Sequence, residues 1–180
     1  MSDSRLPAFL YLLMLVLGVL QWVHVYPQLP ETMASHFSAN GTPNGWQPKQ
    51  AFFLFSAFVI AMTTLPSFVV PRLLGSLPAS LINLPHKEYW LAPERREETT
   101  RYFRAQMAWF GCALLFLLLY AISQAINANL PGIRHFGAQG MWYVLGGFML
   151  FTLVWTIYFL RHFYNVPPSH LSSSPGMGQK

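Results

Sequence analysis

The histidine at position 36 has the broadest chemistry in this sequence, because an imidazole can bind a metal ion, change charge near neutral pH or contact a partner. It lies in a polar segment, residues 27–49, that also holds Glu31; His24 precedes this segment and His135 lies in a second one. Two or three of these side chains could meet as a zinc site, but their spacing fits no closed ligand motif. We expect no metal here and a hydrogen-bonding role for His36, with a metal-dependent hydrolase as an alternative.

Sequence patterns typical of soluble or metal-dependent enzymes are absent. The chain has no HExxH, GxSxG, phosphate-binding loop or paired-cysteine pattern. Its single cysteine, Cys112, lies in a hydrophobic run, where a small apolar packing role is expected. We therefore predict a non-enzymatic protein without a cofactor.

The composition predicts an integral membrane protein. Hydrophobic residues make up 53% of the chain and charged residues 9%, whereas a soluble domain is about 25% charged. The basic residues behind the net charge of +5 lie beside apolar runs, which favours membrane lipid over nucleic acid as a partner. Four windows are long and apolar enough to cross about 30 Å of hydrocarbon: about residues 6–26, 51–70, 107–126 and 141–160.

These windows predict an all-α fold, a single domain over residues 1–165 with four transmembrane helices, followed by a disordered tail at 166–180. No small-residue cleavage site ends the first window, so we expect it to be retained rather than removed as a signal peptide. Pro66 predicts a kink in the second window, with Thr63 and Thr64 placed to satisfy freed carbonyls. No span carries Asp, Glu, Lys or Arg near its centre, which argues against a secondary transporter.

The distribution of Lys and Arg predicts the orientation. With both termini on the cytoplasmic side, nine basic residues are inside and only Lys49 and Arg134 are outside. This bias follows the positive-inside rule. The segment 27–49 would then face the outside and the segment 82–104 the cytoplasm.

The outer segment is rich in residues that shape the backbone. Asn40-Gly41 and Asn44-Gly45 are turn dipeptides, and a shaped loop is a common place for a binding surface. We therefore predict that this loop is ordered and meets a peptide or envelope ligand. Its candidate binding residues are Pro30, His36, Phe37, Gly41, Pro43, Asn44, Gly45, Trp46 and Lys49.

The cytoplasmic segment predicts a helix that begins near Pro93 and runs without a break into the third span. Proline suits the first position of a helix, and Glu94 falls in the turn where the helix dipole favours an acid. We expect Tyr89 and Trp90 to anchor at the lipid headgroups. The candidate residues for a protein partner on this side are Asn83, Pro85, Tyr89, Trp90, Pro93, Glu94, Arg95 and Arg96.

These two segments together resemble a bacterial membrane family. It carries a domain of unknown function that is also found at the N-terminus of the SdpI immunity protein. The outer pattern runs from Leu29-Pro30 through His36-Phe37 and Gly41 to Lys49, and the inner pattern covers residues 83–96, so the resemblance extends over about residues 10–125. It implies a bacterial inner-membrane location and a role in immunity or membrane signalling.

The resulting hypothesis is a non-enzymatic inner-membrane protein of immunity-like or envelope-sensing type that acts through residues 27–49. Two alternatives remain open. One is a membrane-embedded metal-dependent hydrolase that uses His36, and the other is an accessory subunit of a larger membrane complex.

Overall fold

Four long helices form the protein, as the sequence predicts. The computed structural model describes residues 4–132 and 138–166 and is 74% helical. Four stretches are long and apolar enough to cross a membrane: Arg5–Gln28, Lys49–Leu73, Arg96–Asn129 and Ala138–Tyr164. The first comprises helix α1 (Arg5–Val25) and a short 3-10 turn (Tyr26–Gln28), and the last two are α5 (Arg96–Asn129) and α6 (Ala138–Tyr164).

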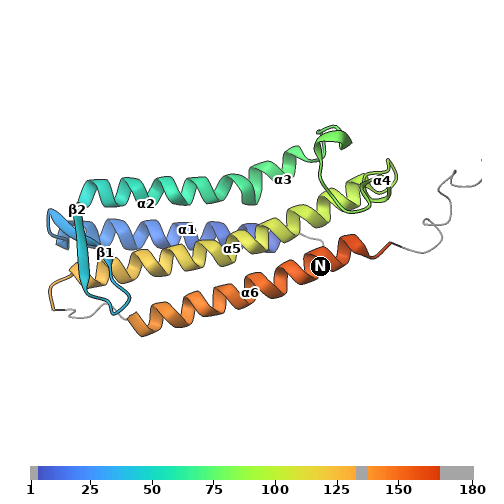
Figure 1. Cartoon of the computed structure of the whole chain (residues 1–180). Coiled ribbons are helices and arrows are strands. Elements are labelled where there is room, and N and C mark those ends of the chain that lie inside the picture. Colours follow the sequence, from blue (N-terminus) through green and yellow to red (C-terminus); the bar gives the residue numbers. More distant parts are fainter. Residues whose placement is uncertain (1–3, 133–137, 167–180) are drawn as a thin grey trace, which may run out of the picture.

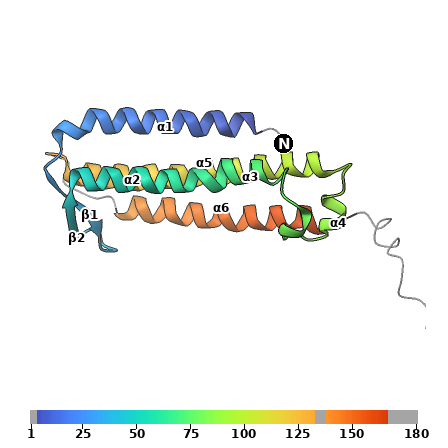
Figure 2. The ribbon, with the colours of Figure 1, turned by 90° about the horizontal axis from the view of Figure 1, so that it is seen from above.

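Helix α5 is the centre of the bundle. It packs against α1, against α2 (Lys49–Thr64) and against α6. Figure 2 shows α1 and α6 on opposite sides of α5, with α2 lying over it, and Figure 1 shows α2 above α1 and α5. Large apolar side chains remain exposed along α1, α2 and α6, as expected where lipid replaces water as the solvent.

At Pro66, where the sequence predicts a kink, the helix changes to a π-helical stretch, Leu65–Val69, between α2 and α3 (Val70–Leu73). Proline cannot donate a backbone hydrogen bond, so the regular helical pattern fails at this point. The hydroxyls of Thr63 and Thr64 both donate to the Ile60 carbonyl at 2.8 Å, and Ser67 Oγ donates to the Thr63 carbonyl at the same distance. The two threonines therefore bond to a carbonyl one turn back, and not to the Met62 carbonyl that loses its amide donor at Pro66.

The prediction of an all-α fold is wrong at one place, because a β-hairpin lies between α1 and α2. Strands β1 (Thr32–Phe37) and β2 (Pro43–Pro48) form a two-stranded antiparallel sheet. The hairpin crosses one end of the bundle, which we call the hairpin end (Figure 1). Two six-residue runs around an Asn-Gly dipeptide are a hairpin signal, but the sequence-based prediction included only the turns.

At the opposite end, α3 and α5 are joined by a segment with a short 3-10 turn (Ala79–Leu81) and helix α4 (Lys87–Trp90). We call this the α4 end. Helix α5 is continuous from Arg96 to Asn129, so the predicted uninterrupted third helix is confirmed. Its start is not at Pro93, because the Arg95 amide donates to the Ala92 carbonyl at 2.9 Å and closes a turn there first.

Candidate functional site

The hairpin is fixed to the bundle by Asn129, near the end of α5. The Asn129 side chain accepts a hydrogen bond from the Ala34 amide and donates one to the Ala34 carbonyl, both at 2.8 Å. An asparagine amide thus pairs with β1 as a neighbouring strand would. Below this contact, the fully buried Met33 packs in a cluster with Val25, Phe52 and Ile126. Strand β1 is therefore part of the core of the bundle.

Lys49 closes the base of the hairpin, where β2 meets α2. Its backbone amide donates to the Glu31 carbonyl at 2.9 Å. Its side chain is only 10% exposed, with Nζ 2.9 Å from the Glu31 carboxylate and 3.4 Å from the Leu29 carbonyl. The same ammonium lies 4.8 Å from the centre of the Tyr26 ring. Lys49 stays a predicted binding residue, and the structure places its side chain in contacts that close the base of the hairpin.

The tip of the hairpin is a tight loop over Ser38–Thr42. The Ser38 amide and hydroxyl both donate to the Thr42 carbonyl, at 2.9 and 3.0 Å. Gly41 has φ of 86°, a backbone conformation that suits glycine. Trp142, at the start of α6, donates from its indole to the Ala39 carbonyl at 3.2 Å. The tip is thereby attached to α6.

His36 lies on β1 opposite Gly45, and these two residues approach closely. A Cβ atom added to Gly45 would lie 2.9 Å from His36 Cβ, far closer than the usual separation of about 4.5–5.5 Å in cross-strand pairs. His36 Nδ1 lies 2.5 Å from Asn44 Oδ1. The expected hydrogen-bonding role of His36 is thus present. The Asn44-Gly45 pair, however, lies within a strand and forms no turn.

The register of the two strands is irregular on both sides of His36. A β-bulge changes the normal alternation of side chains between the two faces of a strand. As a result the consecutive residues Ser35 and His36 both line one pocket beneath the hairpin. Gln47, on β2, lines it as well.

This pocket, which we call the hairpin pocket, has a volume of about 420 Å³ and lies between the hairpin, α2 and α5. Its roof is polar, and its walls are mostly apolar. The wall residues on α2 are Phe52, Phe55, Ser56 and Val59, and those on α5 are Leu118, Ala121, Ile122 and Ala125. A pocket that joins a polar roof to apolar walls suits a ligand with both characters.

Of the predicted outer residues, only His36 lines the hairpin pocket. Trp46 is 62% exposed and lies outside it. Phe37 packs against the core cluster, and Pro30, Pro43 and Asn44 are exposed. Ser35 and Gln47 were not predicted as site residues, because only the register of the hairpin shows that they line the same pocket.

The predicted residues at the α4 end form a second cluster around Trp90. The indole of Trp90 donates to the Phe163 carbonyl at 2.9 Å and its ring stacks on His162, with ring centres 4.9 Å apart. The predicted headgroup anchor therefore packs against the end of α6. Arg95 lies 4.1 Å above the ring of Tyr89.

The remaining predicted residues of this segment surround Trp90 without forming a shared pocket. The Arg96 guanidinium donates to the Leu77 carbonyl. Asn83 lines a small cavity of about 180 Å³ that also touches Ile82 and Thr99. The other members are exposed or half-buried: Pro85, Pro93 and Glu94.

Among the residues that the structure describes, no three His, Cys, Asp or Glu side chains are grouped to hold a metal ion. His135, a possible partner of His36 in the zinc hypothesis, lies outside the described residues, as does most of the predicted tail. Cys112 is buried and its thiol donates to the Pro7 carbonyl at 3.1 Å.

Comparison with known proteins gives one match. No curated protein and no solved structure is detectably similar to the chain. The match is to a protein-family model. It starts within α1, includes the whole hairpin and ends within α2, so residues 83–96, which carry the inner pattern, lie outside it. Residues 12–61 match the family described as Domain of unknown function (DUF1648).

Proposed function

We propose that this chain is a non-enzymatic membrane protein of immunity-like or envelope-sensing type, and that it binds an amphiphilic ligand in the hairpin pocket. The observation that carries this proposal is the lining of that pocket. Ser35, His36 and Gln47 offer hydrogen-bonding groups at the hairpin, next to the aromatic and aliphatic walls of α2 and α5. A membrane-active peptide or a lipid-like envelope component has both a polar and an apolar part.

The edges of the hairpin favour recognition by side chains over addition of a strand. The edge of β1 that does not pair with β2 is occupied at Ala34 by the Asn129 side chain. Strand β2 begins at Pro43 and ends at Pro48, and proline has no amide hydrogen to offer a pairing strand. A bound peptide would therefore insert side chains or an acyl chain into the pocket.

The charge distribution supports placing the hairpin pocket on the extracytoplasmic side of a bacterial inner membrane. At the hairpin end the only basic residue that the structure describes is Lys49, whose ammonium is paired with Glu31. The other described basic residues lie at the α4 end: Arg5, Arg72, Lys87, Arg95, Arg96, Arg101, Arg104 and Arg161. The positive-inside rule assigns that end to the cytoplasm, where exposed Glu94 and Asn83 are available to a protein partner.

A survival assay tests this function. Cells that express the full chain are challenged with a membrane-active peptide toxin, and protection is compared between variants. Val59 is half-buried in the pocket wall, so Val59→Trp should fill the pocket and abolish protection at unchanged expression. His36→Ala should weaken protection, because it removes a polar group from the roof.

Two matched variants separate the pocket from other surfaces. Leu54 is on the same helix, is 72% exposed and does not line the pocket, so Leu54→Trp should protect like the wild type. Trp46→Ala removes the exposed ring on the hairpin and should also protect. Loss of protection with Trp46→Ala but not with Val59→Trp would move the site to the outer face of the hairpin.

A further inference from the structure

A groove runs along the side of the bundle between α1 and α6, with α5 as its floor. Both outer helices pack against α5, and they lie on opposite sides of it (Figure 2). In the middle of the bundle this groove widens to a pocket of about 580 Å³ lined by all three helices. Representative lining residues are Leu10 and Leu17 on α1, Trp109 and Phe116 on α5, and Gly147 and Phe151 on α6.

This middle part of the groove is apolar. Apart from Trp109, whose indole carries an N–H, the only lining residue with a side-chain donor is Cys112. The Cys112 thiol already donates to the Pro7 carbonyl. An occupant therefore meets mainly aliphatic and aromatic groups, which suit hydrocarbon chains.

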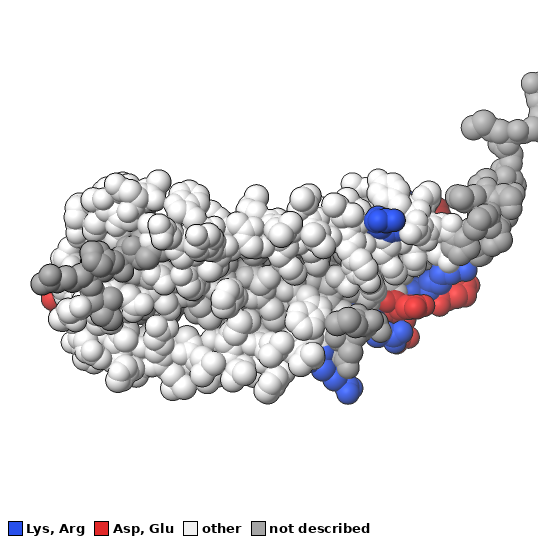
Figure 3. All heavy atoms as spheres, turned by 90° about the horizontal axis from the view of Figure 1, so that it is seen from below, with Lys and Arg blue, Asp and Glu red and all other residues white. Residues whose placement is uncertain are grey.

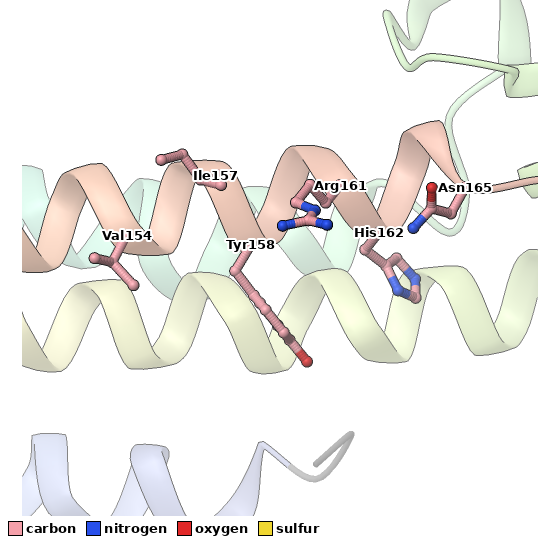
Figure 4. A pocket seen from close by; sticks show the side chains of 6 residues that line it. All are labelled: Val154, Ile157, Tyr158, Arg161, His162 and Asn165. Carbon is pink, nitrogen blue, oxygen red and sulfur yellow. The ribbon is translucent and has the colours of Figure 1, made fainter.

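Towards the α4 end, the same face of α6 becomes polar. A second pocket of about 560 Å³ is lined by Val154, Ile157, Tyr158, Arg161, His162 and Asn165. Gly147, Phe151, Val154, Tyr158, Arg161 and Asn165 follow one another at spacings of three and four residues, which places them along one face of the helix. Figure 4 shows Tyr158 and His162 extending from α6 across α5.

Arg161 is the charged group of this polar part. It is exposed, and its guanidinium has no ion pair or hydrogen bond with the described part of the chain. The neighbouring His162 is held between two rings, with its centre 3.7 Å from Tyr102 and 4.9 Å from Trp90. Figure 3 shows the bundle from below, where the Lys and Arg side chains in view gather towards the α4 end and the described surface between the two ends is uncharged.

We propose that this groove is a binding site for one anionic phospholipid from the leaflet at the α4 end. The phosphate would lie at Arg161 and Asn165, and the acyl chains would fill the apolar pocket around Gly147. Gly147 and Arg161 are about 21 Å apart along the helix at 1.5 Å per residue. That distance matches half of a bilayer that is about 40–45 Å thick with its headgroups.

Charge selects this occupant over a transmembrane helix of a second copy. The groove ends at Arg161, which has no ion pair within residues 4–132 and 138–166, and an apolar helix would supply no counter-charge to its guanidinium. A phosphate group supplies one and can also accept a hydrogen bond from the Asn165 side chain. The site is separate from the hairpin pocket, and its occupancy is independent of the function proposed above.

Native mass spectrometry of the full chain in mild detergent tests the proposal. The protein is mixed with equal amounts of phosphatidylglycerol and phosphatidylcholine that carry the same acyl chains. We expect one phosphatidylglycerol to be retained about fivefold more than phosphatidylcholine, the fold-change equivalent to about 1 kcal/mol for one basic residue. Arg161→Gln should abolish this preference.

Two matched controls accompany these measurements. Arg72→Gln removes a charge at the same end from α3, where the guanidinium donates to the Phe68 carbonyl at 2.5 Å, and it should keep the preference. Gly147 and Gly146 both have open space around an added Cβ, but only Gly147 lines the groove. Gly147→Leu should reduce retention of both lipids, whereas Gly146→Leu should not.

Three results would overturn the proposal. Equal retention of the two lipids would show unselective contact with the bulk membrane. Equal loss with Arg72→Gln and Arg161→Gln would show a general charge effect. A lipid-free dimer that Gly147→Leu dissociates would show that a second copy fills the groove.

Discussion

The side chain of Asn129 and the backbone of Ala34 form two hydrogen bonds of 2.8 Å, although the residues are 95 positions apart. Asn129 also donates to the Ala125 carbonyl at 2.7 Å, which fixes its own orientation on α5. A helix residue thus takes the place of a third strand. This contact joins the hairpin to the central helix and sets the roof of the hairpin pocket.

Replacing Asn129 with leucine should release the hairpin while the helices stay assembled. The variant leaves the buried amide and carbonyl of Ala34 without partners, at a cost of about 1–3 kcal/mol. Hydrogen–deuterium exchange of residues 32–37 should rise strongly, with little change in α1 and α5. Asn127→Leu, on the same turn of α5, is the control, and equal exchange in the two variants would refute the role of Asn129.

The close approach of Gly45 and His36 predicts a coupled pair of substitutions. Gly45→Ala places its Cβ 2.9 Å from His36 Cβ and should destabilise the hairpin by about 1–3 kcal/mol. In a His36→Gly background the same change should cost much less. Thermal unfolding of the four proteins in detergent gives the coupling, and additive effects would mean that the clash is relieved elsewhere.

Lys49 and Glu31 should contribute unequally to stability, although their side chains are paired. Glu31 is 78% exposed, so Glu31→Gln should cost less than about 1 kcal/mol. Lys49→Met keeps the size of the buried side chain but leaves the Leu29 carbonyl without its ammonium donor, at about 1–2 kcal/mol. Apparent melting temperatures in detergent check this order. Equal losses would mean that the ion pair dominates.

The orientation of the chain can be tested with single cysteines. Ala39 is exposed at the tip of the hairpin and Glu94 is exposed at the α4 end. A membrane-impermeant thiol reagent should label Ala39→Cys in intact cells and Glu94→Cys only after permeabilisation. The wild-type chain is the control, since its buried Cys112 should stay unlabelled. The opposite labelling pattern would invert the proposed topology.

The four spans were predictable because each depends on local composition alone. Runs of about 20 apolar residues specify a membrane helix wherever they occur, and the kink at Pro66 follows from the chemistry of one residue. The continuous start of α5 was also predictable, apart from the turn that ends at Arg95. Such features need no knowledge of distant contacts.

The hairpin pocket was not predictable in this way, because it depends on contacts between distant residues. Gln47 and Ser35 are ordinary polar residues until the bulge at His36 brings them to one face. Asn129 gives no sign in the sequence that it binds Ala34. Trp90 was predicted to anchor at the lipid headgroups, and nothing in the sequence signals that its indole also donates to the Phe163 carbonyl, 73 positions away.

Photo-cross-linking in living cells tests most directly whether the hairpin pocket binds a ligand. A benzophenone amino acid replaces either Val59 in the pocket wall or Leu54, which is exposed on α2 outside the pocket. Cells are given the membrane-active peptide of the survival assay and are then irradiated with ultraviolet light. Our account predicts an adduct with the mass of the peptide at position 59 and none at position 54. Equal adducts at both positions, or none at position 59 in cells that the wild-type chain protects, would contradict it.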